Sequence, residues 1–376
     1  MQEQKLTSNI PWGMIGLIAV ISLIGLLGVY SATYSSRGVS SIFYKQLMWI
    51  GIGMVIMFAM LIPNYHTIGR YAYTLYWISV AMLLLVMLIG RTGMGAQRWL
   101  ALGPIAFQPS ELAKLAVALS LARFFSSNPR PGGYRLTDLG WPAAMVALPL
   151  VMVLKQPDLG TAMMLLITSS IIVIVAGLRV RSIIIIAIAG ITLASSVFLI
   201  PPVKNTLWGS LKPYQQKRIK AFIDPASDSL GSGYHANQSR IAVGSGRVTG
   251  KGFGQGTQSQ LAFLPERHTD FIFAVIAEER GLIGAGFLIM LYLALLLYGI
   301  EAAKNAKDRL GALMASGVVS LLAVYFFINI GMAVGVAPVV GVPLPLASYG
   351  GTAIITTFLS LGLLLNIHSK RFMLFY

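Results

Sequence analysis

The scarce charged side chains of this chain gather in one stretch, from Gly256 to Gly286. Four of the twelve acidic residues fall inside it, on both sides of the apolar run Phe271 to Ala277. The ionisable residues of this stretch are Glu266, Arg267, His268, Asp270, Glu278, Glu279 and Arg280. A carboxylate in so polar a neighbourhood is a candidate for a functional site, which makes Asp270 the first residue to consider. The plain alternative is that Thr269 or Asp270 only caps a helix that begins at Phe271.

Two more ionisable residues lie three positions apart at the start of a predicted span. Glu111 and Lys114 share one face of a helix and can pair there, and an ionisable pair inside a span indicates a polar cavity. The alternative reading is structural. Glu111 suits the positive end of a helix that Pro109 opens, and Lys114 can extend its side chain to the membrane surface. The sequence leaves both readings open.

Three further charged residues lie in connections predicted on the same outer side. Asp158, within the sequence KQPDLG, either caps the sixth span or faces a cavity. Arg98 precedes the fourth span, and Lys155 lies between the fifth and the sixth. The six residues predicted to converge near one membrane face are Asp270, Glu111, Lys114, Asp158, Arg98 and Lys155.

The sequence contains little that would support metal or thiol chemistry. Cysteine is absent, which excludes disulfides, thiolate metal sites and cysteine nucleophiles. The four histidines, His66, His235, His268 and His368, show no ligand spacing, so no protein-built metal site is predicted. Nothing in the sequence brings a particular serine to a histidine, and a Ser-His-Asp triad is equally unsupported.

The composition is that of an integral membrane protein. Hydrophobic residues make up 56% and charged residues 11% of the chain, with a mean hydropathy of +0.76, which is too apolar for a water-facing surface. The net charge of +16 comes from bases scattered among loops. This pattern indicates membrane topology and lipid headgroups rather than nucleic acid. No cleavable signal peptide is expected, because the first apolar stretch is long enough to span.

The predicted fold is an all-α integral membrane protein with about ten transmembrane helices, forming a single polytopic domain over residues 1–376. The ten predicted spans are Pro11–Tyr30, Gln46–Ile62, Tyr71–Gly90, Pro109–Phe125, Trp141–Leu154, Leu159–Gly177, Ser182–Ile200, Leu282–Ile300, Leu310–Met332 and Thr352–Ile367. An even number places both termini on one side. Twelve bases lie in the loops on that side and five in the short loops opposite, which predicts cytoplasmic termini.

One connection is far longer than the others, because residues 201–269 contain no spanning stretch. Counting the spans from a cytoplasmic N-terminus places this large loop outside the cytoplasm, between spans seven and eight. Within it, Leu211–Ile223 has the pattern of an interfacial helix, or equally of a solvated basic one. The glycines that follow, up to Gly256, favour tight turns and do not match a phosphate-binding loop. The later segment Val334–Gly351 is apolar but rich in Pro and Gly, so it is expected to be buried or to line a cavity.

Five segments of the sequence resemble one known family. They are GAQRWLALGPIAFQPSELAK (Gly95–Lys114), KQPDLGTA (Lys155–Ala162), DPASDSLGSGYHANQS (Asp224–Ser239), GTQSQLAFLPERHTDFIFAVIAEE (Gly256–Glu279) and PVVGVPLPLASYGGTA (Pro338–Ala353). These segments are similar to the SEDS family of bacterial shape, elongation, division and sporulation proteins, and closer to its elongation branch than to its division branch. The resemblance covers nearly the whole chain in order.

The resemblance implies ten spans in the bacterial cytoplasmic membrane. It also implies a peptidoglycan glycosyltransferase that polymerises lipid II on the outer side. The partners it implies are a class B penicillin-binding protein, which is the crosslinking transpeptidase, other elongation-complex proteins, and membrane lipids. By motif, Asp270 matches the family's catalytic aspartate, while Glu111, Lys114 and Asp158 match polar positions of its central cavity.

A mechanism follows as a hypothesis. Asp270 deprotonates the acceptor 4-hydroxyl, which attacks the donor anomeric carbon and inverts it. The polyprenyl pyrophosphate that leaves needs positive charge, for which Arg98, Lys114 and Lys155 are candidates. No cofactor is built in, although a divalent cation, Mg or Mn, could accompany the pyrophosphate. Two alternatives stay open: a flippase for the lipid-linked precursor, and a non-catalytic scaffold for a transpeptidase.

Overall fold

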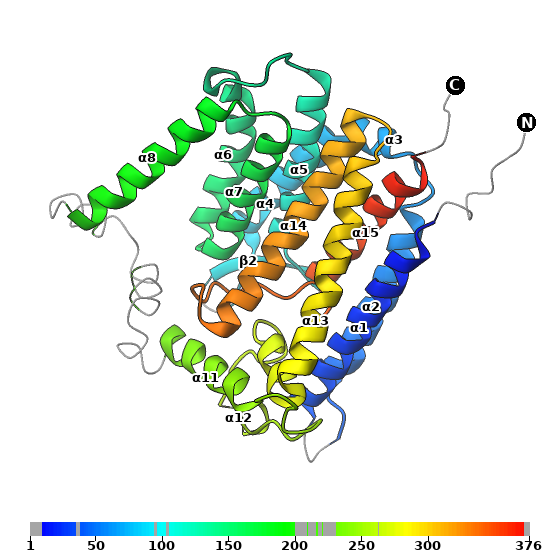
Figure 1. The fold of residues 1–376 in the computed structure, drawn as a ribbon, viewed down its shortest axis with the longest axis vertical. Helices are drawn as coiled ribbons and strands as arrows, with labels where there is room; N and C mark the ends of the chain where they lie inside the picture. Colours follow the sequence, from blue (N-terminus) through cyan, green and yellow to red (C-terminus); the bar gives the residue numbers. More distant parts are fainter. Residues whose placement is uncertain are drawn as a thin grey trace, which may run out of the picture.

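The apolar stretches of the sequence form long helices that pack side by side (Figure 1). The computed structural model describes residues 10–34, 38–93, 96–102, 105–199, 209, 216, 220, 231–261 and 263–371. The long helices are α1 (Trp12–Thr33), α2 (Ser41–Ala59), α4 (Ala72–Ile89), α5 (Pro109–Ser127), α6 (Gly140–Lys155), α7 (Leu159–Val175), α8 (Val180–Leu199), α13 (Ile272–Lys304), α14 (Arg309–Val334) and α15 (Gly351–Ser369). Shorter helices are α3 (Tyr65–Arg70), η2 (Leu136–Leu139), α11 (Ser232–Ser245) and α12 (Thr257–Gln260).

Each of the ten predicted spans overlaps one of the long helices. Within the described ranges, seven helical stretches are long and apolar enough to cross a membrane. They contain α1, α2, α4, α6, α13, α14 and α15. Helix α5 carries three charged residues, and α7 is only 17 residues long. The chain is therefore a helical, multi-pass membrane protein.

A small antiparallel sheet between α4 and α5 was absent from the all-α prediction. Its strands, in the order β1-β2-β3, are β1 (Arg91–Gly93), β2 (Ala96–Leu102) and β3 (Ile105–Phe107). Only two residues separate each pair of strands in the sequence, which is the commonest hairpin spacing. The sheet places Arg98 on its middle strand, which contacts α4 and α5.

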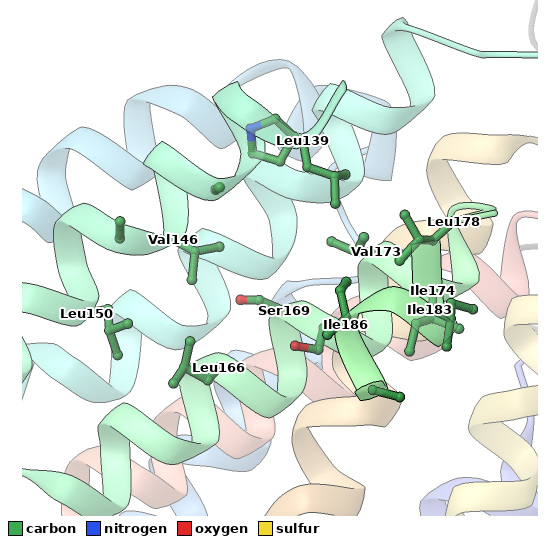
Figure 2. A pocket seen from close by; sticks show the side chains of 15 residues that line it. Leu139, Val146, Leu150, Leu166, Ser169, Val173, Ile174, Leu178, Ile183 and Ile186 are labelled. Atoms are coloured by element: carbon green, nitrogen blue, oxygen red, sulfur yellow. The ribbon is translucent and has the colours of Figure 1, made fainter. Parts of the chain in front are cut away.

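Helix α14 lies at the centre of the bundle, where it packs against α5, α7, α13 and α15. In contrast, α8 leans away from its neighbours (Figure 1). A cavity of about 430 Å³ lies between α6, α7 and α8 (Figure 2). Its lining is apolar except for Ser169 and Ser170. The lining of this cavity therefore offers no group suited to acid–base or phosphate chemistry.

Helix α13 is interrupted at Gly281, and the glycine-rich segment that precedes the helix in the sequence hydrogen-bonds to the backbone there. Gly281 has a φ of 65° and a ψ of −164°, so the helical hydrogen bonds stop there. A helix would join the amides of Leu282 and Ile283 to the carbonyls of Glu278 and Glu279. Four bonds to residues 247–252 replace these two. Lys251 and Gly252 donate to the carbonyls of Glu278 and Glu279, both at 3.0 Å, while Leu282 and Ile283 donate to the carbonyls of Arg247 and Val248 at 2.8 and 3.1 Å.

This arrangement needs glycine because two backbones run in close contact. A Cβ atom on Gly250, whose φ is +83°, would lie 2.2 Å from the Glu279 carbonyl oxygen. The N-terminal part of α13 is further fixed by its buried acids. Glu278 forms a 2.6 Å ion pair with Lys251 and accepts from the amide of Gln258 at 2.9 Å. Glu279 accepts a hydrogen bond from Ser31 on α1.

Gly250→Ala is expected to lower the free energy of unfolding by roughly 2–5 kcal/mol, from backbone strain and the clash together. Gly254→Ala is the matched control, since Gly254 also has a positive φ, of +72°, but no atom lies within 4 Å of its added Cβ. It is expected to lose only about 1–2 kcal/mol. Thermal melting of both variants in detergent measures the difference. Equal losses of unfolding free energy in the two variants would show that residues 247–252 do not pack closely against α13.

Candidate active site

Most of the charged residues predicted to converge line one cavity of about 260 Å³. Its walls are helices α5, α7, α14 and the start of α15, strand β2, the turn before α13 and the segment between α14 and α15. Its polar and aromatic lining residues are Arg98, Trp99, Gln108, Glu111, Lys114, Asp158, Thr161, Glu266, Thr269, Asp270, Tyr325, Tyr349 and Thr352. Five of the six predicted residues are among them. Lys155 is the exception: it is exposed and lines no part of this cavity.

Glu111 and Lys114 form a buried ion pair with 2.8 Å between Oε1 and Nζ. Pro109 opens α5 and Glu111 lies in its first turn, as expected from their positions. The snorkelling alternative for Lys114 is wrong, because the residue is only 2% exposed. Its ammonium donates to the Tyr325 hydroxyl, which in turn donates to Oε2 of Glu111. The three side chains close a ring of hydrogen bonds between α5 and α14.

Asp158 serves both of the roles considered for it. Its carboxylate accepts from the Thr161 amide at 3.2 Å and from the Thr161 hydroxyl at 2.9 Å, so it caps α7. The same carboxylate lines the cavity, where Gln108 Nε2 lies 3.4 Å from it. Arg98 is held close by. Its guanidinium donates to the carbonyls of Gln156 and Pro157 and has Nη1 3.9 Å from Asp158 Oδ1.

The backbone fixes Asp270 from two sides. Its amide donates to the Glu266 carbonyl at 3.1 Å, and its carbonyl accepts from Asn329 Nδ2 at 2.8 Å. Asn329 also donates to the Val342 carbonyl at 2.7 Å and so ties the turn, α14 and the following segment together. The capping alternative is wrong for α13, whose N-cap residue is Phe271 without a side-chain hydrogen bond. The Asp270 carboxylate is partly exposed and faces the cavity.

The second half of the segment between α14 and α15, from Leu344 to Ser348, is buried, and residues 340–343 line the cavity, which agrees with the expectation for this Pro- and Gly-rich stretch; Val336, near its start, is exposed. The segment is held by side-chain bonds to its own backbone and to the turn. Ser348 accepts from the Leu344 amide and donates to the Thr269 carbonyl, while the Tyr349 amide donates to the His268 carbonyl at 2.9 Å. Gly341, with a φ of +72°, leaves room for Asp270: a Cβ there would lie 3.3 Å from Oδ2.

The cavity is acidic as a whole. Its described lining contains four carboxylates, from Glu111, Asp158, Glu266 and Asp270, and two cations, which gives a formal charge of −2. No three His, Asp or Glu side chains of the described residues form a group suited to a metal ion. Beside the cavity, burial lowers the pKa of His268 from its ordinary value of 6.5, so this imidazole is neutral at pH 7.

Sequence reasoning did not identify Tyr325, Gln108, Thr161, Glu266 or Gly341 as lining residues. Tyr325 lies in an otherwise apolar span, and nothing local marks a tyrosine there as polar in function. Its role depends on a contact 211 residues away in the chain. Glu266 was noted only as part of the charged stretch. The positive φ of Gly341 and its proximity to Asp270 are likewise tertiary features.

These features define a class: a multi-pass membrane protein whose helices surround an acidic cavity that holds a fixed, partly exposed aspartate. Residues 9–372 match the FtsW/RodA/SpoVE family of cell cycle proteins, and the chain belongs to that family. The predicted SEDS membership is thereby confirmed.

The chain is 42% identical over 347 residues to peptidoglycan glycosyltransferase MrdB of Escherichia coli strain K12, covering 92% of this chain and 90% of that one. It is 30% identical to peptidoglycan glycosyltransferase RodA of Treponema pallidum, covering 91% and 94%. Similarity to these relatives supports the elongation branch.

Solved structures are similar over nearly the full length. One comes from work on structural coordination of polymerization and crosslinking by a peptidoglycan synthase complex, with a TM-score of 0.81 and 32% identity over 96% of this chain and 98% of that one. Another is an aspartate-to-alanine variant of the rod shape determining protein RodA of Thermus thermophilus, with a TM-score of 0.71 and 30% identity over 97% and 99%.

Proposed function

We infer that this chain is a peptidoglycan glycosyltransferase that polymerises lipid II into glycan strands during cell elongation. The observation that carries this inference is the 42% identity to a peptidoglycan glycosyltransferase over 92% of the chain. The cavity is consistent with it, because glycosyl transfer from a pyrophosphate donor needs one base and a polar site at the membrane surface. Asp270 supplies a carboxylate of the kind that such a base requires.

The reaction balances with Asp270 as the base. The acceptor 4-hydroxyl oxygen attacks the donor anomeric carbon while its proton passes to the Asp270 carboxylate. The bond between that carbon and the pyrophosphate oxygen breaks, and the polyprenyl pyrophosphate leaves with the electron pair. Attack from the face opposite the leaving group inverts the anomeric carbon. No acid is needed, because pyrophosphate is already a good leaving group.

The leaving pyrophosphate needs positive charge nearby, and the cations of the cavity lining are already bonded to other protein groups. Lys114 already donates to Glu111 and Tyr325, and Arg98 already donates to two carbonyls. Lys155 is exposed away from the cavity, so it reaches a substrate only from outside. With a lining charge of −2, a polyanion binds more readily when a divalent cation, Mg or Mn, accompanies it. We expect such a cation to enter with the substrate.

We place ten spans in the bacterial cytoplasmic membrane, one for each long helix, within a single polytopic domain of residues 1–376. Both termini then lie in the cytoplasm and the 201–269 loop lies outside. The arrangement in Figure 1 supports this: α1 begins and α15 ends toward the same end of the bundle, and α11 and α12 cover the opposite end. Most of the predicted interfacial helix, Leu211–Ile223, lies outside the described residues.

Single cysteines test this orientation cleanly, because the chain has no native cysteine. Ser127 and Thr249 are both exposed and lie on opposite predicted sides. In cells whose outer membrane surface is accessible, an impermeant thiol reagent is expected to label Thr249→Cys and not Ser127→Cys. Permeabilisation should make both react. Labelling of Ser127→Cys alone in intact cells would reverse the proposed topology.

The partners follow from the function. The substrate is lipid II, and a class B penicillin-binding protein crosslinks the strands that this chain makes, together with other elongation-complex proteins. The structurally similar protein solved within a peptidoglycan synthase complex supports such an assembly. The scattered bases are assigned to membrane lipids and topology, with no role in nucleic acid binding.

The decisive experiment is polymerisation by the purified wild-type complex in detergent, with lipid II as the sole sugar substrate and glycan length resolved on gels. Polymer of many repeats is the expected product. In detergent no membrane has to be crossed, so a flippase or a scaffold yields no polymer even when folded. Absence of polymer from a monodisperse complex would favour those alternatives.

A further inference from the structure

The apolar cavity between α6, α7 and α8 extends along less than half of the membrane thickness. Its lining runs from Pro142 to Leu150 on α6 and from Leu166 to Ile174 on α7 (Figure 2). Each run rises about 12 Å, at about 1.5 Å per residue, whereas the hydrocarbon core of a bilayer is about 30 Å thick. The cavity lies toward the start of α6 and the end of α7. The proposed topology puts these helix ends at the cytoplasmic side, so the cavity belongs to the inner leaflet.

The cavity is open toward the surrounding lipid. Helix α8 leans away from its neighbours (Figure 1), and the lining side chains Leu166, Ile174 and Ile186 are exposed. A hydrocarbon chain can therefore enter from the bilayer. A partner's spanning helix fits less well, because such a helix is about 10 Å across and about 30 Å long, while the cavity holds about 430 Å³. That volume corresponds to about one helical turn with its side chains.

Arginines gather at the cytoplasmic end of this cavity, in the two connections that flank it. Residues 128–139 and 176–182 contain four arginines and a single acid, Asp138, which gives a formal charge of +3. The arginines are Arg130, Arg135, Arg179 and Arg181. The same connections also supply lining residues of the cavity, Leu139 and Leu178. The basic groups and the apolar cavity are therefore parts of one continuous surface.

Hydrogen bonds join the two connections and hold the arginines together. The Tyr134 amide donates to the Gly177 carbonyl at 2.9 Å, and the Arg179 amide donates to the Tyr134 carbonyl at 3.0 Å. The guanidinium of Arg179 donates through Nε to the Gly133 carbonyl at 3.1 Å. The other two positions, Arg135 and Arg181, are exposed, as groups that meet a lipid headgroup must be.

We propose that this cavity and its arginines bind one anionic phospholipid of the inner leaflet. An acyl chain lies between α6, α7 and α8, and the phosphate lies against the arginines. Basic pockets between spanning helices on the cytoplasmic side suit anionic headgroups. A zwitterionic lipid fits less well, because it brings a cation of its own to a region of charge +3. The proposal is independent of the glycosyltransferase reaction and depends on the proposed topology for the leaflet alone.

Lipid binding to the purified chain tests the part played by the arginines. Phosphatidylglycerol or phosphatidylcholine with the same chains is added to delipidated protein in a non-ionic detergent, and bound lipid is counted by native mass spectrometry. We expect wild type to bind phosphatidylglycerol at least about tenfold more tightly, and Arg135→Gln with Arg181→Gln to lose most of that preference. Equal binding of the two lipids by wild type would overturn the proposal.

Lys304→Gln with Lys307→Gln is the matched control for charge. It removes two exposed bases from the connection between α13 and α14, which contributes nothing to the cavity lining. This variant should bind phosphatidylglycerol as wild type does. A loss as large as that of the arginine variant would mean that net charge alone attracts the lipid, which would overturn a site at the arginines.

Filling the cavity tests the part played by the acyl chain. Ala147→Trp places a bulky side chain in the lining, and Ala144→Trp, an exposed change on the same helix outside the lining, is its control. We expect only Ala147→Trp to weaken phosphatidylglycerol binding, at least about fivefold, with lipid-free melting temperatures of both variants close to wild type. Glycerol phosphate, which has no chains, should not displace the lipid. Displacement by glycerol phosphate, or unchanged lipid binding by Ala147→Trp, would overturn the chain-binding role. Release of the transpeptidase by an Ala147→Trp variant that still binds the lipid would assign the cavity to a partner helix instead.

Discussion

Asp270→Asn is expected to lose at least about a hundredfold in lipid II polymerisation, the usual scale for removal of a general base. The amide is nearly the same size as the carboxylate but cannot take a proton from the acceptor hydroxyl. The structure also separates this effect from folding. The backbone amide and carbonyl of Asp270 bind Glu266 and Asn329, and the substitution leaves both of these bonds in place. Thermal melting and partner binding should therefore stay close to wild type.

Glu266→Gln is the matched control for this experiment. Glu266 lines the same cavity as Asp270, so its substitution removes the same unit of negative charge from the same region. A loss smaller than tenfold in this control, beside the large loss in Asp270→Asn, would assign the proton transfer to Asp270. Comparable losses would mean that the negative charge of the region matters rather than one base. An active Asp270→Asn enzyme would remove Asp270 as the base and leave polymerisation in place.

Much of the candidate site could be predicted because its ionisable residues are conspicuous in an apolar chain. The predicted spans placed these residues on one side of the membrane, and the structure brings five of them to one cavity: Asp270, Glu111, Lys114, Asp158 and Arg98. Asp158 shows why competing readings need a structure: both of its carboxylate oxygens accept from Thr161, and the same carboxylate lies beside Gln108 and Arg98 in the cavity, so both readings hold. The same argument placed Lys155 on this side, but the residue is exposed and lines no part of the cavity, which spacing alone does not reveal.

The parts that could not be predicted depend on backbone geometry and on contacts far apart in the sequence. The break at Gly281 is filled by hydrogen bonds from residues 247–252, and no local pattern specifies that pairing. Glycine composition indicated tight turns, while the actual constraint is close contact between two backbones. The small sheet before α5 was missed because its strands are short and Ala96–Leu102 lacks a clear alternation of polar and apolar residues.

The buried ring of Glu111, Lys114 and Tyr325 leads to the second large effect. Glu111→Gln and Lys114→Met are each expected to lower the free energy of unfolding by about 3–5 kcal/mol, because each leaves an unpaired charge in a water-poor interior. The double variant should lose less than the sum of the two, since neither charge then remains. Tyr325→Phe keeps the ion pair and removes one hydroxyl, so about 1–3 kcal/mol is expected. Melting in detergent and polymerisation on lipid II are the two measurements.

Ser120→Ala controls for a buried polar change on the same helix, because the Ser120 hydroxyl makes a single neutral hydrogen bond to the Ala72 carbonyl at 3.0 Å. Its loss should be near 1 kcal/mol, with polymerisation little changed. A coupling energy of about 0.5–3 kcal/mol between Glu111 and Lys114 would establish that they act as one unit. Additive losses would instead mean two separate roles, a charge at the start of α5 and an independent lysine. In that case the ring between α5 and α14 would not be what holds the cavity wall in place.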